Sequence, residues 1–381
     1  MISAMMKIVV VIVEKKTKNN LLKDSKAKSF RIFFLFFGIY RLYNHRIYIK
    51  EGQVVLKNSR IYDSVIQNLC GELNTVLAQI PSKYKGKVEE IRLRNGGPLT
   101  ISYESKDYFI STNGSVSLTP SNAMIIREEH IRNTFQIISN YSVYAYEEEI
   151  RNGYITIKGG HRVGIGGKII YGSNGLETIK NISSLNIRIG KEILGVSDSI
   201  IPYLVKIPGI FYNTLIVSPP QCGKTTLLRD IVRNLSNGFS LLKANGFKVS
   251  IVDERSEIAG MYKGIAQNDI GIRTDVLDGC LKSDGIMMAI RALSPDIIAV
   301  DEIGSKKDVE AINEALRAGI KLIATIHGSN LEEVMRKSSM KELFEEKVFE
   351  RFIILDRSKG VGSIKEIIDG YSFKPIYELK G

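Results

Sequence analysis

The sequence contains few of the residues that build metal clusters or disulfide frameworks. Among 381 residues there are 4 histidines, no tryptophan and 3 cysteines, Cys70, Cys222 and Cys280. The cysteines lie far apart and form no CxxC pair, so neither a structural zinc site nor a disulfide framework is predicted. Cysteine usage of this kind fits a protein of the reducing cytoplasm.

The first fifty residues also lack an apolar run long enough to cross a bilayer. Their two apolar runs, residues 8–13 and 32–40, are far shorter than the roughly 20 residues of a transmembrane helix. Lysines lie between the runs and no small-residue cleavage site follows, which argues against a secretory signal peptide. Two interpretations of residues 1–55 remain, a basic, aromatic anchor on a membrane surface or a non-native extension translated from a misassigned start. The abrupt change in composition after this segment favours the extension.

The excess of positive charge is confined to this segment. The chain has a net charge of +12, but residues 1–50 hold 11 of its 53 Lys and Arg residues and only 2 of its 41 acidic residues. The rest of the chain carries 42 basic and 39 acidic side chains and is nearly neutral. A general nucleic-acid-binding protein is therefore disfavoured, because such proteins present a strongly basic surface.

Residues 56–195 have the pattern of a small α+β domain. Helical spacing of apolar residues predicts one helix over 61–80 and another over 128–139. Short apolar runs divided by turn residues predict strands at 88–93, 99–103, 108–111, 154–158, 163–170 and 184–189. The glycine-rich stretch 159–167 lacks the strand–GxGxxG–helix context of a dinucleotide loop, so hairpin turns are the favoured interpretation.

From residue 196 onward the pattern changes to strands alternating with helices, which is typical of a parallel sheet. Buried strands are predicted at 215–217, 249–252, 297–300 and 322–324, and an amphipathic helix at 224–235. Each of these strands ends in a polar residue, and parallel sheets place active residues at the carboxyl ends of their strands. We therefore expect an α/β fold, with a RecA-like P-loop domain over 196–381.

A phosphate-binding loop follows the first of these strands. Its residues are Ser218, Pro219, Pro220, Gln221, Cys222, Gly223, Lys224, Thr225 and Thr226. They match G-x-x-x-x-G-K-[ST] except at Ser218, and the motif lies between a strand and a helix, as it must. We expect the loop amides to bind the phosphates of ATP, Lys224 to contact the β- and γ-phosphates, and the Thr225 hydroxyl to coordinate Mg²⁺. A chance GKTT after a strand is the alternative.

An apolar strand ending in two carboxylates follows about eighty residues later. Asp301 is predicted to hold Mg²⁺ through its water shell, and Glu302 to polarise the attacking water as a general base. Such a strand end is a weak signal alone. After a phosphate-binding loop it indicates the Walker B element of a P-loop ATPase.

Two further strand ends carry candidate catalytic residues. Asp253 and Glu254 follow the strand at 249–252 and are predicted either to position Mg²⁺ or water, or to form a solvated strand end with an internal salt bridge. His327 lies at the tip of the strand that begins at 322. We expect it to donate a hydrogen bond to the γ-phosphate, with a purely structural histidine as the alternative.

These four elements, in this order, resemble the secretion and type IV pilus family of hexameric ATPases. The closer resemblance is to the stage III sporulation protein AA family of endospore-forming bacteria and covers roughly residues 60–375. It is carried by segments 90–94, 160–164, 183–188, 271–278, 287–295, 300–304 and 324–328. The sequence departs from the family at Ser218 and Gln221, where glycine is usual. Glycine adopts φ > 0 without penalty, so Gln221 is expected to strain the loop or weaken nucleotide binding.

The resemblance implies a ring-shaped ATPase, a homo-hexamer that drives a secretion-like channel between mother cell and forespore. Its partners would be membrane proteins of the stage III sporulation channel complex. It would lie in the mother-cell cytoplasm, peripherally associated with the membrane through those partners. In such rings arginines approach the γ-phosphate, and by analogy Arg162, Arg188 and Arg273 are the candidates. Each of them has the alternative of an ordinary surface or salt-bridge role.

Two rival functions remain open. A nucleic-acid-binding ATPase is known among related P-loop proteins, although no nucleic-acid-binding module is recognisable here and no nucleic acid is expected as a partner. A nucleotide-gated scaffold that binds ATP but barely hydrolyses it would be favoured by strain at Gln221.

Overall fold

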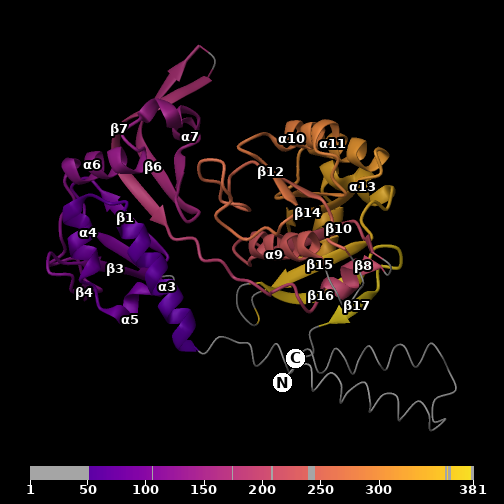
Figure 1. Ribbon diagram of the computed structural model, residues 1–381, viewed down its shortest axis with the longest axis horizontal. Helices are drawn as coiled ribbons and strands as arrows, with labels where there is room; N and C mark the ends of the chain where they lie inside the picture. The colour runs from indigo at the N-terminus through magenta and orange to yellow at the C-terminus, as the bar shows by residue number, and fades with distance from the viewer. Residues whose placement is uncertain are drawn as a thin grey trace, which may run out of the picture. The chain divides into compact units, whose positions relative to one another are not determined.

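The computed structural model describes residues 51–104, 106–173, 175–206, 209–238, 245–356, 358 and 362–378 (Figure 1). Residues 1–50 of the predicted basic extension lie outside the described residues. No helix in the described ranges is both long and apolar enough to span a membrane. The chain divides into two compact units, Met1–Ser59 and Arg60–Gly381, and helix α3 (Glu51–Ile66) leads into the second unit.

A seven-stranded antiparallel sheet organises the first half of this second unit, with strand order β4-β3-β2-β1-β7-β6-β5. Its strands are β1 (Glu90–Arg94), β2 (Thr100–Tyr103), β3 (Lys106–Ile110), β4 (Val116–Ser117), β5 (Tyr154–Ile157), β6 (His161–Gly172) and β7 (Gly175–Arg188). The helices are α4 (Gly71–Ala78), α5 (Ser82–Lys85), α6 (Glu128–Ile138) and α7 (Glu147–Arg151), with a 3-10 turn η1 (Val143–Tyr146). Apolar residues of α4 and α6 share one core with alternate residues of the strands. The predicted α+β architecture is confirmed.

The single helix predicted over residues 61–80 is wrong, because the segment forms two helices, α3 and α4. Cys70 has an extended backbone conformation, with φ −60° and ψ 153°. Its N–H donates to the hydroxyl of Thr134, 3.2 Å away, instead of to a carbonyl one helical turn earlier. A tertiary hydrogen bond therefore interrupts an apolar pattern that continues across the break, and Gly71, a poor helix former, starts the second helix.

The glycine-rich stretch 159–167 forms a β-hairpin, as predicted. Gly159 and Gly160 turn the chain between β5 and β6 with φ of 92° and 72°, values that favour glycine. Strands β6 and β7 are longer than their apolar runs suggested and continue as a hairpin away from the rest of the sheet (Figure 1).

An eight-stranded sheet organises the second half, with strand order β12-β11-β13-β14-β10-β15-β16-β17. Its strands are β10 (Thr214–Ser218), β11 (Val249–Asp253), β12 (Thr274–Asp278), β13 (Ile297–Val300), β14 (Lys321–His327), β15 (Arg351–Asp356), β16 (Ser363–Asp369) and β17 (Pro375–Glu378). The six strands from β12 to β15 in this order are mutually parallel, and β16 and β17 add an antiparallel edge. The four predicted strands are present as β10, β11, β13 and β14.

Helices cover both faces of this sheet. They are α8 (Ile201–Leu204), α9 (Lys224–Asn237), α10 (Lys282–Ala292), α11 (Lys306–Arg317), α12 (Leu331–Met335) and α13 (Lys341–Glu345), with a 3-10 turn η3 (Ser338–Met340) and a two-stranded ribbon of β8 (Val205–Lys206) and β9 (Ile210–Phe211). The apolar face of α9 packs in one core, and α10 and α11 pack in the core of the opposite face (Figure 1). Because both faces are covered, the central strands β10, β11 and β13 are buried throughout and mostly apolar. The expected RecA-like P-loop fold is confirmed.

The parallel arrangement brings distant parts of the chain together at one edge of the sheet. Strand β10 ends at Ser218, directly opposite His327 at the end of its neighbour β14. Strand β13 ends at Val300, just before Asp301 and Glu302, and helix α11 then begins with a capping box formed by Ser305 and Asp308. The prediction that domains divide near residues 55 and 195 stays a prediction.

Candidate active site

The phosphate-binding loop connects β10 to α9 in a conformation that favours glycine at two positions. Gly223, the residue before the helix, has φ 88°, and Gln221 has φ 59°. Ser218 is fully buried and its hydroxyl donates to the Pro219 carbonyl at 2.8 Å. The first N–H groups of a helix have no intrahelical acceptor, so the start of α9 is suited to bind an anion.

Lys224 is held by acceptors from two other strand ends. The residue as a whole is 8% exposed. Its ammonium donates to the Glu302 carboxylate and to His327 Nε2, the latter at 2.6 Å, and the same His327 nitrogen lies 2.8 Å from Glu302 Oε1. Three residues that are 25 to 103 positions apart therefore form one hydrogen-bonded cluster, and their roles toward ATP stay predictions.

A second cluster joins the hydroxyl of Thr225, which follows Lys224, to the carboxylate of Asp301. Thr225 donates to Asp301 Oδ2 at 2.7 Å, and the buried Thr325 hydroxyl donates to the other carboxylate oxygen. A threonine hydroxyl and a carboxylate oxygen within 3 Å are hard ligands that fit one Mg²⁺ ion. P-loop sites complete such an ion with phosphate and water rather than with further side chains.

Glu302 is positioned by its backbone as well as by its carboxylate. Its φ of 55° is a left-handed conformation that is costly for a non-glycine residue. The Glu302 N–H donates to the Thr325 hydroxyl at 2.9 Å. Burial acts to raise the pKa of Glu302, but the hydrogen bond and charge of Lys224, with those of His327, outweigh it and lower the pKa. The carboxylate is therefore ionised at neutral pH, as a general base must be.

The predicted acidic pair lies apart from this cluster. Asp253 is 2% exposed and accepts three backbone N–H bonds of 2.9 Å from Glu257, Ile258 and Ala259. Burial raises its pKa to about 6. Glu254 forms an ion pair with Lys282. Within the described residues neither carboxylate bonds to a member of the Lys224 cluster, so Asp253 organises the loop after β11 and its catalytic role stays a prediction.

Arg162 and Arg188 are neighbours on the seven-stranded sheet, where they face each other across β6 and β7. Arg162 stacks on the Tyr154 ring, 3.6 Å from its centre, and pairs with Glu257. Arg188 lies 3.2 Å from a carboxylate oxygen of Glu90. In this structure Arg162 pairs with a carboxylate of the loop after β11 and Arg188 with one of its own sheet, and a role at a γ-phosphate stays a prediction.

The remaining predicted residues make local contacts. Arg273 donates to the Ser236 carbonyl at 2.9 Å, which ties the start of β12 to the end of α9. The buried Cys222 thiol contacts the Pro220 carbonyl at 3.7 Å. Thr226 lies on the first turn of α9 and is partly exposed. Within the part of the chain that the structure describes, none of these three side chains bonds to a member of the Lys224 cluster.

Two residues of the site were not predicted from the sequence. Thr325, two residues before His327, contacts both residues of the Walker B pair, the carboxylate of Asp301 and the N–H of Glu302. Arg255 places its guanidinium 3.7 Å from Glu302 Oε2, with a side chain 62% exposed. Arg255 directly follows the predicted acidic pair, so its position beside a strand end was the signal that could have identified it.

Sequence comparisons relate this chain to known proteins. The sequence family described as "Sporulation stage III, protein AA" matches residues 59–373. Stage III sporulation protein AA of Bacillus subtilis (strain 168) is 40% identical over 309 residues, which cover 81% of this chain and 95% of that protein. Protein SEEDLING PLASTID DEVELOPMENT 1 of Arabidopsis thaliana is 30% identical over 166 residues, covering 42% of this chain and 22% of that protein.

Among solved structures, the ATPase DotB of Legionella pneumophila aligns with a TM-score of 0.44 and 16% identity, over 70% of this chain and 72% of that chain. The family match extends over most of the sequence and includes both halves of the second unit. The chain belongs to the family of stage III sporulation protein AA.

Proposed function

We propose that this protein is the Mg²⁺-dependent ATP-hydrolysing motor of a secretion-like channel complex between mother cell and forespore, required in endospore formation. One observation carries the enzymatic part. Lys224, Thr225, Asp301, Glu302 and His327, drawn from three neighbouring strand ends, form hydrogen-bonded clusters at one edge of a parallel sheet. Family membership supports the sporulation part.

The side chains of the site suggest how ATP would be bound. Lys224 leaves Glu302 and contacts the β- and γ-phosphate oxygens, while the amides at the start of α9 bind the same groups. Thr225 and Asp301 would hold Mg²⁺, and such an ion would supply positive charge beside the phosphate oxygens. Binding therefore exchanges an internal cation–carboxylate pair for a cation–phosphate pair.

Hydrolysis would then proceed by attack of water on the γ-phosphorus. Glu302, freed from Lys224, accepts the water proton as the new P–O bond forms and the bond to the ADP oxygen breaks. His327 donates a hydrogen bond to the γ-phosphate, and Arg255 is placed to stabilise negative charge beside Glu302. The proton on Glu302 passes to solvent as phosphate leaves.

We further propose that the protein assembles as a homo-hexamer at the mother-cell side of the membrane, held there by membrane proteins of the channel complex. The near-neutral charge of residues 51–381 supports protein partners over nucleic acid. Hydrolysis would change the angle between the two halves of the chain and so drive transport.

Nucleotide binding and turnover by the purified full chain test the proposal. Lys224→Ala should abolish ATP binding, whereas Glu302→Ala should retain binding and lose hydrolysis. Normal turnover by Glu302→Ala would rule out Glu302 as the base. Turnover stimulated by an oligonucleotide would favour a nucleic-acid-binding ATPase, and ATP binding without turnover by the unchanged protein would favour a nucleotide-gated scaffold.

A further inference from the structure

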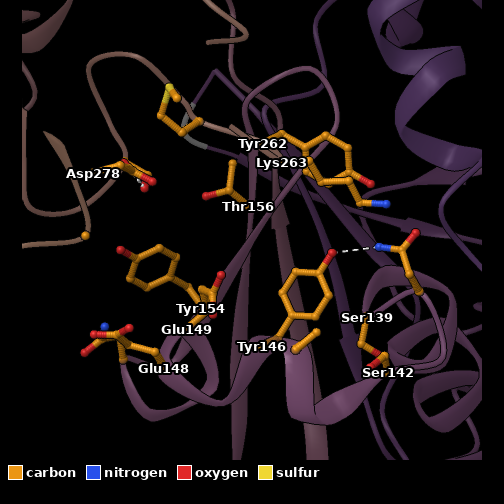
Figure 2. Close-up of a pocket in the computed structure, with 16 residues that line it drawn as sticks. Ser139, Ser142, Tyr146, Glu148, Glu149, Tyr154, Thr156, Tyr262, Lys263 and Asp278 are labelled. Atoms are coloured by element: carbon orange, nitrogen blue, oxygen red, sulfur yellow. Dashed lines mark hydrogen bonds between the residues drawn. The ribbon is translucent and has the colours of Figure 1, made fainter. Parts of the chain in front are cut away.

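A second cavity, of about 440 Å³, lies within the second unit and shares no lining residue with the Lys224 cluster. It is enclosed by the end of α6, the η1–α7 segment, β5 and the loops after β11 and β12 (Figure 2). Ligand cavities in proteins commonly have volumes of about 300–1,000 Å³. The space is therefore sufficient for a small organic molecule.

The lining of this cavity is acidic. Glu148, Glu149 and Asp278 contribute carboxylates, and Lys263 is the one basic side chain among the described residues that line it. Burial raises the pKa of Asp278 and the charge of Glu149 adds to this, whereas the hydrogen bond that Ser256 donates to Asp278 Oδ1 at 2.6 Å acts to lower it. The carboxylates of Glu149, on α7, and of Asp278, at the end of β12, therefore act on the same space and favour a positive charge there.

Two hydroxyl groups of largely buried residues face the cavity and have no hydrogen-bond partner among the described residues. Tyr154 is 8% exposed and Thr156 is 9% exposed, and neither hydroxyl forms a hydrogen bond with any described residue. Both extend from β5 toward the side of the cavity where Asp278 lies (Figure 2). The guanidinium of Arg162 stacks on the Tyr154 ring, which fixes the direction of its hydroxyl. Both hydroxyls are therefore available to form hydrogen bonds with a molecule in the cavity.

We propose that this cavity binds an organic cation, whose ammonium or guanidinium group is held by Glu149 and Asp278 and by the hydroxyls of Tyr154 and Thr156. An anion would meet two net negative charges. An apolar ligand would leave the carboxylates and hydroxyls unsatisfied. Within the described residues no three acidic, histidine or cysteine side chains are close enough to share one metal ion, which favours a polyatomic cation over a point charge.

The aromatic side chains of the lining fit the same ligand. Tyr146 and Tyr262 line the cavity near these groups, and the Tyr146 hydroxyl already accepts a 2.7 Å hydrogen bond from Asn140 (Figure 2). Aromatic rings attract ammonium and guanidinium groups through their faces. Carboxylates and phenol rings together recognise both the charge and the alkyl part of such a cation.

Calorimetric titration of the full chain without nucleotide tests this inference independently of ATPase activity. The probes are spermidine, L-arginine and N-acetyl-L-arginine amide. We expect saturable binding of at least one probe, weakened about tenfold or more by Glu149→Gln and by Asp278→Asn, because each removes a charge-assisted hydrogen bond. Tyr154→Phe removes only a hydroxyl and should weaken binding about threefold to tenfold.

Glu147→Gln is the matched control, since Glu147 lies exposed on the same helix α7 but does not line the cavity. The Glu147→Gln variant should bind each probe as tightly as the unchanged protein does. Binding of the blocked arginine amide as tightly as free arginine would identify a side chain of a partner protein as the natural ligand, and preference for free amines would identify a small molecule. Absence of saturable binding by all three probes, or equal loss in Glu147→Gln and Glu149→Gln, would overturn the inference.

Discussion

Replacement of Glu302 by glutamine should make ATP binding tighter while it removes hydrolysis. Lys224 donates to the Glu302 carboxylate in the structure, so this ion pair must break before the ammonium can contact phosphate. Glutamine keeps the size of the side chain and removes its charge. Lys224 then loses a competing partner, and the γ-phosphate loses a neighbouring negative charge.

The size of the expected gain in ATP affinity follows from how exposed the Lys224–Glu302 ion pair is to solvent. The Lys224 and Glu302 side chains are 10% and 29% exposed, so the pair lies between a surface ion pair and a buried one. A charged hydrogen bond in this setting is worth about 1–2 kcal/mol net. We therefore expect ATP affinity to rise about fivefold to thirtyfold. Loss of the general base should slow turnover by at least about 100-fold.

Equilibrium titration with a fluorescent ATP analogue and a phosphate-release assay measure the two effects separately. Glu310→Gln is a suitable control, because Glu310 is exposed on α11 and makes no ion pair with a described residue. The pKa of Glu302 lies below the usual glutamate value, so the pair stays charged and the affinity gain should be constant from about pH 8 to pH 6. Unchanged or weaker ATP binding by Glu302→Gln would refute the idea that Glu302 competes for Lys224.

Three further substitutions test the surroundings of this cluster. Thr325→Val removes the hydroxyl that contacts Asp301 and the Glu302 N–H. Turnover should fall about tenfold while ATP affinity changes less than about threefold, and denaturant unfolding should show a loss of stability of about 1–3 kcal/mol. A loss of ATP affinity in proportion to the loss of turnover would contradict a positioning role. Burial raises the pKa of Asp253 to about 6, so its proton is bound more tightly in the folded state and stability is lost as pH rises through 6. Relative to Asp253→Asn, the unchanged protein should gain about 1.4 kcal/mol between pH 7 and pH 5 in denaturant unfolding, and equal pH profiles would contradict this. Gln221 has a φ of 59°, which costs a non-glycine residue about 1 kcal/mol or more, and Gln221→Gly relieves this strain. ATP should therefore bind up to about fivefold more tightly to Gln221→Gly. Gln221→Ala keeps the strain and should not improve ATP binding.

The elements that carry the site could be predicted from the sequence because their signals are local. Apolar runs with a polar residue at the end gave the positions of β10, β13 and β14, and parallel pairing then brought Lys224, Asp301, Glu302 and His327 together. Binding chemistry at strand ends depends on topology more than on side-chain detail. The same reasoning placed the acidic pair at the end of β11, although not its hydrogen bonds.

Long-range contacts account for what the sequence could not show. The break before α4 depends on Thr134, which lies 64 residues beyond Cys70. Whether Asp253 faces solvent or the amides of its own loop depends on how residues 254–259 fold, and no pattern of apolar residues specifies that. Arg255 was within a recognised segment, but only the folded loop brings its guanidinium near Glu302.

The backbone at Glu302 is hydrogen-bonded to β14, the strand that also carries His327. Its left-handed conformation is offset by two hydrogen bonds to Thr325, one from the Glu302 N–H to the hydroxyl and one from the Ile303 N–H to the carbonyl, each 2.9 Å long. Thr325 and His327 lie on the same strand, β14, whereas Lys224 belongs to the loop after β10. The backbone of Glu302 is therefore held by β14, whereas its carboxylate also accepts from Lys224 at the start of α9. Contact between His327 and the γ-phosphate would act on the strand that also holds the base.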